Sequence, residues 1–164
     1  MPTSRSTPYG ITVDRDGTVW FAELSGSKIG RVKPKTGDVK EFSPPTPGQG
    51  ARRIAADLNT GLLWFTEFNA GKIGSFDPKT EQFREYDIPT SESQPYAIFV
   101  DARGSVWFSE FGGNKVARLD AATGQIEEFA IPSAQAGCRT IITDASGTVW
   151  CPESGTAKLL RLII

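Results

Sequence analysis

One pattern of hydrophobic and polar residues occurs four times along this chain. Each copy has a glycine, then a run of β-branched and aromatic residues, then a glutamate, and the copies are Gly17–Glu23, Gly61–Glu67, Gly104–Glu110 and Gly147–Glu153. The tryptophans within them, at positions 20, 64, 107 and 150, recur every 43 or 44 residues. Self-similarity at this period is typical of propeller or solenoid arrays, in which each repeat packs on the next.

Each repeat predicts four short strands. In the third repeat the β-prone runs cover residues 96–100, 105–109, 115–119 and 125–130, and the Asp, Asn and Gly between them are typical of tight turns. No run of useful length has a helical period. Four antiparallel strands per period are the composition of a β-propeller blade. The tryptophan and phenylalanine of each second strand are expected to point to opposite faces of the blade and to pack on its neighbours.

The sequence therefore predicts an all-β fold with a single propeller repeat domain over residues 1–164. The expected blades cover about 7–45, 50–89, 94–132 and 137–164. The chain begins where an outer strand ends and stops after residues 159–162, so the last blade is expected to lack its outer strand and the total is 15 strands. The apolar segment 158–164 would then be an exposed, aggregation-prone edge unless another strand or chain covers it.

Composition and charge argue against two classes of partner. The chain has 18 basic and 19 acidic side chains, a formal net charge of −1, and both signs in every repeat. A nucleic-acid groove or a membrane-surface patch needs a concentrated positive field, so neither is expected. No apolar run is long enough to span a membrane, and no hydrophobic signal core follows the first residues. The compartment stays open.

The two cysteines are expected to be free, largely buried thiols. If residues 144–147 turn a hairpin, Cys151 lies opposite Thr140 and is only the diagonal neighbour of Cys138. Diagonal neighbours are about 7–8 Å apart. A disulfide usually needs about 4.4–6.8 Å between Cα atoms.

Four recurring motifs resemble the virginiamycin B lyase (streptogramin lyase) family. In the first repeat they are Pro8–Thr12, Val19–Glu23, Lys28–Arg31 and Glu41–Pro45, and they recur with variation over the whole chain. The resemblance implies a seven-bladed propeller, of which this chain holds about four blades. Three arrangements follow: two copies that close an eight-bladed ring head to tail, a closed four-bladed monomer, or an open fragment.

Candidate binding residues come from two positions of the repeat. The first strand and the second strand form a hairpin, so the residues that open the first strands should share one face of the ring with the glutamates that end the second strands. These candidates are Tyr9, Arg52, Tyr96 and Arg139 with Glu23, Glu67, Glu110 and Glu153. Such a set could hold a cation or a hydroxylated or charged small molecule.

An architectural interpretation competes with this one, because a motif present in every blade is usually structural. In it Arg52 pairs with Glu67, Arg139 pairs with Glu153, and the tyrosine hydroxyls satisfy Glu23 and Glu110, since buried charges require partners. The loops 44–53 and 133–140 depart most from the repeat. They make Arg52 and Arg139, with the glutamates beside them, the preferred candidates.

The resemblance also implies a magnesium-dependent elimination on cyclic depsipeptide antibiotics, with histidine as acid or base in the loops that enter the first strands. Tyr9, Arg52, Tyr96 and Arg139 fill those positions here, and the chain contains no histidine. Neither tyrosine nor arginine replaces it near neutral pH at its ordinary pKa. We therefore assign no catalytic residue and expect a binding or scaffold propeller. The alternatives are a magnesium-dependent lyase or a calcium-dependent, lactonase-like hydrolase, with Glu67 and Glu153 as the metal candidates.

Overall fold

The fold is all-β, and it confirms the predicted class. The computed structural model describes residues 1–164 and contains 15 strands in four antiparallel sheets of four, four, four and three strands. The first sheet contains β1 (Pro8–Val13), β2 (Val19–Glu23), β3 (Lys28–Val32) and β4 (Val39–Phe42). The second contains β5 (Ala51–Ala56), β6 (Leu63–Glu67), β7 (Lys72–Asp77) and β8 (Gln82–Asp87). The third contains β9 (Pro95–Val100), β10 (Val106–Glu110), β11 (Lys115–Leu119) and β12 (Ile126–Ala130). The last contains β13 (Ile142–Thr143), β14 (Val149–Glu153) and β15 (Lys158–Leu162).

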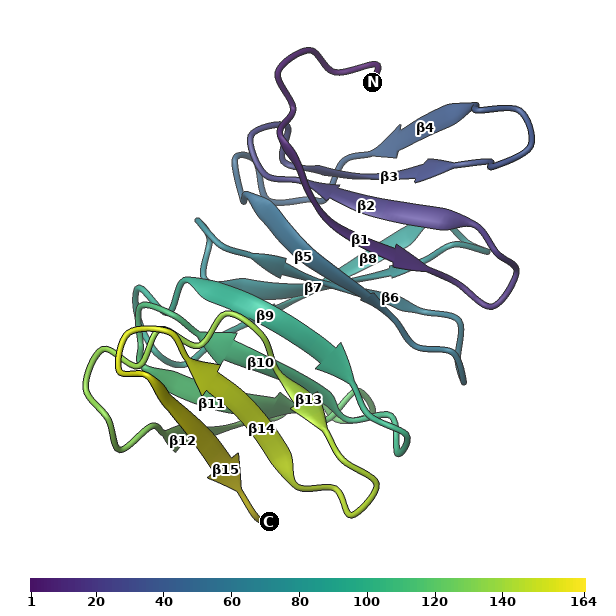
Figure 1. Ribbon diagram of the computed structural model, residues 1–164. Helices are drawn as coiled ribbons and strands as arrows, with labels where there is room; N and C mark the ends of the chain where they lie inside the picture. Colours follow the sequence, from purple (N-terminus) through teal and green to yellow (C-terminus); the bar gives the residue numbers. More distant parts are fainter.

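The four blades form an open row. Figure 1 shows the first and fourth blades at opposite ends of the row, while the first strands β1, β5 and β9 of successive blades lie next to one another. The closed four-bladed ring considered from the sequence is therefore not what this single chain adopts. The structure contains no helix long and apolar enough to cross a membrane.

An aspartate in the first turn of the blade fixes each hairpin. Asp14 accepts hydrogen bonds from the turn backbone and from Trp20 Nε1 at 2.7 Å, and Asp101 and Asp144 hold their tryptophans at 3.0 and 2.8 Å. The second blade departs from this pattern, since Asp57 accepts from the Thr60 hydroxyl instead. Local polar bonds of this kind set the start of the second strand.

Hydrophobic cores fill the spaces between blades. The tryptophan face of each blade packs on the phenylalanine face of the next, as the repeat predicts. Trp20 thus shares a cluster with Phe65, and Trp64 shares one with Phe108. Trp107 packs in the last cluster with Cys151, which replaces the phenylalanine of the fourth blade.

A β-bulge opens the first hairpin of each complete blade. In the second blade Ala51 pairs with Glu67 and Ile54 pairs with Phe65, so two residues on β5 oppose one residue on β6. The same shift occurs between Pro8 and Ile11 in the first blade, and opposite Phe108 and Glu110 in the third. Bulges of this kind re-aim side chains and are frequent beside functional sites.

The prediction of two free thiols was wrong, because Cys138 and Cys151 form a disulfide with 5.9 Å between their Cα atoms. The regular ladder of the fourth hairpin pairs Ile142 with Trp150, whereas an isolated bridge joins Cys138 to Glu153. The register therefore shifts by one residue between the two points. This irregularity brings the diagonal pair within the usual disulfide distance.

Candidate functional site

The bulges gather the predicted tyrosines and arginines at one end of the side on which the first strands of the blades meet. The Tyr9 and Tyr96 hydroxyls, from the first and third blades, share a hydrogen bond of 2.5 Å. Arg52, from the second blade, donates to the Tyr9 hydroxyl at 3.3 Å. The Arg139 guanidinium lies 6.0 Å from the Tyr96 ring centre. All four sequence-predicted first-strand residues are therefore in one cluster, which we call the tyrosine–arginine cluster.

Arg52 is the centre of this cluster. Its guanidinium carbon lies 3.9 Å from the ring centre of Tyr96, 4.4 Å from that of Phe68 and 4.7 Å from that of Tyr9. Guanidinium planes stack favourably on aromatic faces, and the contact strengthens as water is excluded. Its buried Nε has no hydrogen-bond partner. Aromatic rings thus hold Arg52 where the sequence suggested that a carboxylate would.

Arg53 belongs to the same cluster and was not among the predicted site residues. Its guanidinium lies 5.2 Å from the Tyr9 ring centre and 5.7 Å from that of Tyr96. Arg52 and Arg53 are the two bulged residues that oppose the single residue Thr66, and a bulge of this type re-aims side chains. The doubled arginine was visible in the sequence, but alternation along a regular strand would have sent its two side chains to opposite sides.

The tyrosine–arginine cluster contains positive charge without a paired carboxylate. The chain has five ion pairs, and none involves Arg52, Arg53 or Arg139. The predicted pairs of Arg52 with Glu67 and of Arg139 with Glu153 are therefore absent. The Tyr96 hydrogen bond, with that of Arg52, lowers the pKa of Tyr9 below its usual value.

The predicted glutamates do not line the side of the row on which the first strands of the blades meet. Glu23, Glu67, Glu110 and Glu153 are all buried, with no more than 4% of any residue exposed. A side-chain carbon at Gly26 would lie 2.5 Å from Glu23 Oε2, and one at Gly113 would lie 2.7 Å from Glu110 Oε2. The carboxylates thus lie beneath the turns between second and third strands. In each blade the first strand lies on that side, and the side chains of the second strand point toward neighbouring blades.

Three of the buried glutamates lack hydrogen-bond partners, and their pKa values are raised. The carboxylate oxygens of Glu23, Glu67 and Glu110 have no hydrogen-bond partner, so the predicted bonds from tyrosine to Glu23 and Glu110 are absent. Burial raises the pKa of Glu67 to about 8 and that of Glu110 to about 7, and the Glu85 and Glu128 carboxylates add to these shifts. Burial also raises the pKa of Glu23.

Glu153 differs from the other three. It accepts a hydrogen bond of 2.5 Å from the Thr156 hydroxyl, which lowers its pKa. Glu67 and Glu153 belong to different blades, and no group of three or more acidic or cysteine side chains is placed to hold a metal ion. The tyrosine–arginine cluster offers cationic groups and phenols, whereas magnesium and calcium require several carboxylate or carbonyl oxygens. These four blades do not fit the predicted magnesium or calcium site.

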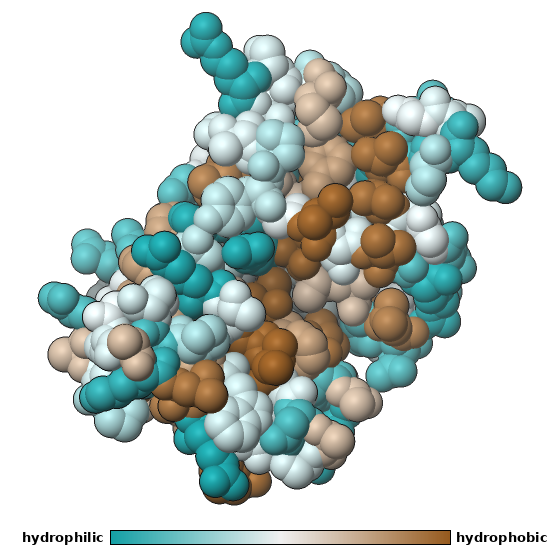
Figure 2. Space-filling view, viewed as in Figure 1, coloured by the Kyte–Doolittle hydropathy of each residue, from teal (hydrophilic) through white to brown (hydrophobic).

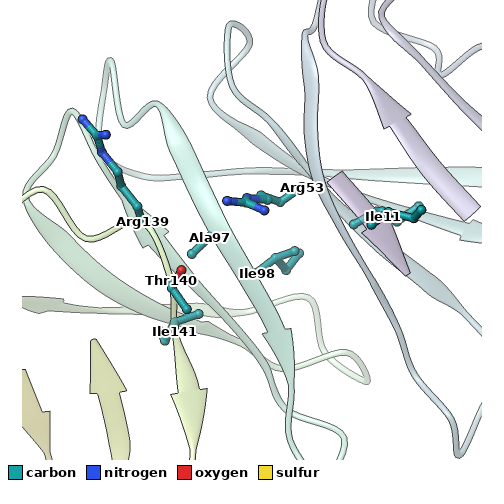
Figure 3. Close-up of a pocket in the computed structure, with 8 residues that line it drawn as sticks. Ile11, Arg53, Ala97, Ile98, Arg139, Thr140 and Ile141 are labelled. Carbon is teal, nitrogen blue, oxygen red and sulfur yellow. The ribbon is translucent and has the colours of Figure 1, made fainter. Parts of the chain in front are cut away.

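A cavity of about 200 Å³ adjoins the tyrosine–arginine cluster. It is lined by residues of all four first-strand segments, namely Ile11, Arg53, Ile54, Ala97, Ile98, Arg139, Thr140 and Ile141. In the view of Figure 3 Arg53 points toward the middle of the lining residues and Arg139 extends away from them, whereas Ile98 and Ile141 lie below and Ile11 lies beyond Arg53. The cavity therefore has both cationic and apolar lining residues.

One isoleucine from each blade lines this cavity. Ile11, Ile54, Ile98 and Ile141 occupy the equivalent position, two residues after the Tyr or Arg of the tyrosine–arginine cluster. We call these four residues the isoleucine floor. The 43- to 44-residue spacing could have revealed them in the sequence, but β-branched residues in a first strand carry no signal that separates a cavity wall from a core.

The fold and this site together define a segment of a β-propeller whose first-strand residues line a cavity. The chain belongs to the virginiamycin B lyase family, whose model matches residues 1–163. The family resemblance predicted from the motifs is therefore confirmed.

Solved structures support the assignment. The chain is similar to virginiamycin B lyase from Staphylococcus aureus, with 34% identity and a TM-score of 0.93, and the match covers 100% of this chain and 55% of that one. A catalytically inactive histidine-to-alanine variant of that lyase, solved with quinupristin, gives 30% identity and a TM-score of 0.88 over 99% of this chain and 57% of that one. The chain thus spans little more than half the length of these lyases. A putative gluconolactonase, with 14% identity and a TM-score of 0.74 over 96% of this chain and 60% of that one, shows the shared fold alone.

Proposed function

We propose that this chain is a small-molecule-binding propeller segment that holds an anionic ligand at the tyrosine–arginine cluster, without the histidine chemistry of the lyases. The supporting observation is three guanidinium groups around one pair of phenols, none of them in an ion pair. Guanidinium groups bind carboxylate and phosphate oxygens through two parallel hydrogen bonds. Arg52 is fixed by its aromatic contacts, which leaves Arg53 and Arg139 to contact a ligand at the cavity.

An arginine substitution tests the proposal with benzoate as the probe. Arg139→Gln should weaken benzoate binding about 10-fold or more, since a hydrogen bond to a charged group contributes about 1.5–3 kcal/mol. Isothermal titration calorimetry at fixed ionic strength measures the change. Arg161→Gln is the matched control, because Arg161 also stacks on an aromatic ring, that of Trp150, but lies outside the cluster. Equal affinity in both variants would contradict the proposal.

Lyase activity is the second candidate, and family membership favours it. The relative solved with quinupristin was inactivated by loss of a histidine, and this chain has none. Tyr9 is the group in the cluster whose pKa is lowered below its usual value, by its hydrogen bonds with Tyr96 and Arg52. Mass spectrometry of quinupristin incubated with the protein and magnesium distinguishes the two candidates, since a ring-opened product that disappears in Tyr9→Phe would establish elimination.

We further propose that a second copy covers the two free blade faces. The first blade exposes Ile11 and Val13, and the fourth exposes Ile142 and Leu159, each between 50% and 70% exposed. Inside the chain the tryptophan faces of the first and second blades pack on the phenylalanine faces of the blades that follow them. The fourth blade's Trp150 face and the first blade's Phe21 face are complementary by the same rule, and two head-to-tail contacts would close a ring.

The mass in solution tests this assembly. Light scattering after gel filtration should give twice the mass of the 17.8 kDa chain. Val13→Glu should place a charge in each contact and return the protein to single chains, whereas Lys35→Glu, at an exposed turn, should not. A single-chain mass for the unchanged protein at micromolar concentration would rule the ring out.

A further inference from the structure

The structure assigns a ligand class to the cavity: a monocarboxylate with a compact or extended apolar body, whose carboxylate contacts Arg53 and Arg139 and whose body lies on the isoleucine floor. This inference rests on the proposed anion-binding role and adds the nature of the rest of the ligand.

The first argument is the composition of the cavity wall. Five of its eight lining residues are apolar, and they include the complete isoleucine floor. Ile54, Ala97 and Ile141 are buried, and Ile98 is half-buried. Figure 2 shows hydrophobic side chains gathered along the middle of this face of the molecule. The apolar surface that a ligand can reach in this cavity comes from Ile11 and Ile98, and it favours contact with an apolar group.

The second argument is that the apolar surface continues away from the arginines. A neighbouring cavity of about 590 Å³ shares Ile54 and Ile98 with the first. Its further apolar lining comes from β5, β9 and the turns that follow them, namely Ala55, Ala56, Leu58, Phe99, Val100 and Ala102. An alkyl chain that starts at the arginines can therefore extend along the first strands. The cavity near the arginines is itself smaller than the usual range for drug-sized ligands, about 300–1,000 Å³.

The third argument concerns the sign and number of charges. Arg53 and Arg139 are the charged residues of the first cavity, and neither is in an ion pair. The second cavity is lined by Asp57 and Asp101, which hold their own turns through hydrogen bonds. A molecule with one anionic end, held at the arginines, and an uncharged body matches this distribution. A dicarboxylate would place its second charge on the floor or near the aspartates, at a cost in desolvation or repulsion.

A series of straight-chain carboxylates tests the inference. Acetate, butanoate, hexanoate and octanoate, each at concentrations where it is monomeric, are titrated calorimetrically at fixed ionic strength. From butanoate onward, affinity should rise about threefold to fourfold per added methylene, which is the effect of burying a CH₂ group. Octanol and octyltrimethylammonium should bind at least about 10-fold more weakly than octanoate.

Two variants distinguish the contribution of the isoleucine floor to binding from that of the arginines. Ile98→Thr should flatten the chain-length dependence while leaving acetate binding unchanged. The matched control is Ile126→Thr, a partly buried isoleucine on the outer strand of the same blade. Circular dichroism and the melting temperature establish that both variants fold.

The outcomes distinguish the two proposals. Equal affinity for acetate and octanoate would overturn the apolar ligand class and leave the anion-binding role in place. No binding of benzoate or of any carboxylate in the series would overturn both. Binding of octyltrimethylammonium as tightly as octanoate would show that the cavity recognises the apolar chain alone, which contradicts the role proposed for Arg53 and Arg139.

Discussion

Replacing both Cys138 and Cys151 by alanine should lower the free energy of unfolding by about 3 kcal/mol, because the disulfide closes a loop between residues 13 apart and removes conformational freedom from the unfolded chain. For a protein of this size the melting temperature should fall by about 6–12 °C. Denaturant unfolding, followed by the fluorescence of the four tryptophans, measures the loss.

Reduction provides the control for this prediction. A thiol reductant should destabilise the unchanged protein by the same amount and should have no effect on the double-alanine variant. The fourth blade should be the part that loosens, since its first strand β13 has only two residues and the disulfide ties the preceding segment to β14. An unchanged unfolding midpoint after complete reduction would show that packing alone holds this blade.

Replacing Glu67 by glutamine should stabilise the protein at alkaline pH. The folded-state pKa of about 8 lies above the ordinary value of 4.5, so between these pH values the native state holds more protons than the unfolded state. Stability contributed by this group is therefore fully present below about pH 4.5 and is lost as pH rises through 8. At pH 9 Glu67→Gln should be more stable than the unchanged protein by on the order of 3 kcal/mol.

The pH dependence separates this effect from a simple change in packing. At pH 5 the stability difference should be small, because Glu67 is then largely protonated in the folded protein. Glu92→Gln, at an exposed position, is the matched control and should change nothing at either pH. If Glu67→Gln instead destabilises the protein at pH 9, the Glu67 carboxylate is charged and stabilised in the fold, which contradicts its raised pKa.

The blades were predictable because each local signal in a repeat agrees with the others. The Asp and Gly turns, the alternating Trp and Phe, and the 43- to 44-residue spacing all indicate four short strands per repeat. The opposite directions of Trp64 and Phe65 follow from the alternation of side chains along a strand, and the structure shows them in different cores.

The site was only partly predictable. Tyr9, Arg52, Tyr96 and Arg139 were expected at one end of the ring and meet there, whereas Glu67 and its equivalents were expected beside them and lie under turns. Position along a strand fixes the end of the blade at which a side chain lies. It does not say whether the side chain points to the axis, and that depends on which strand of the blade carries it.

Irregular backbone explains the remaining differences. The bulge at Arg52 and Arg53 adds a second arginine to the cluster, and the shifted register near Cys138 allows the disulfide. Neither irregularity has a strong local sequence signal, because the residues involved are compatible with a regular strand. The isoleucine floor was not predicted because a residue type repeated in every blade resembles ordinary core.

The most direct test of the central claim is a crystal structure of the full chain with 4-iodobenzoate, located by the anomalous signal of iodine. We predict that the carboxylate lies about 3 Å from the guanidinium nitrogens of Arg53 and Arg139, with the iodine over Ile54 and Ile98. A carboxylate directed away from both arginines, or a ligand bound only outside this cavity, would contradict it.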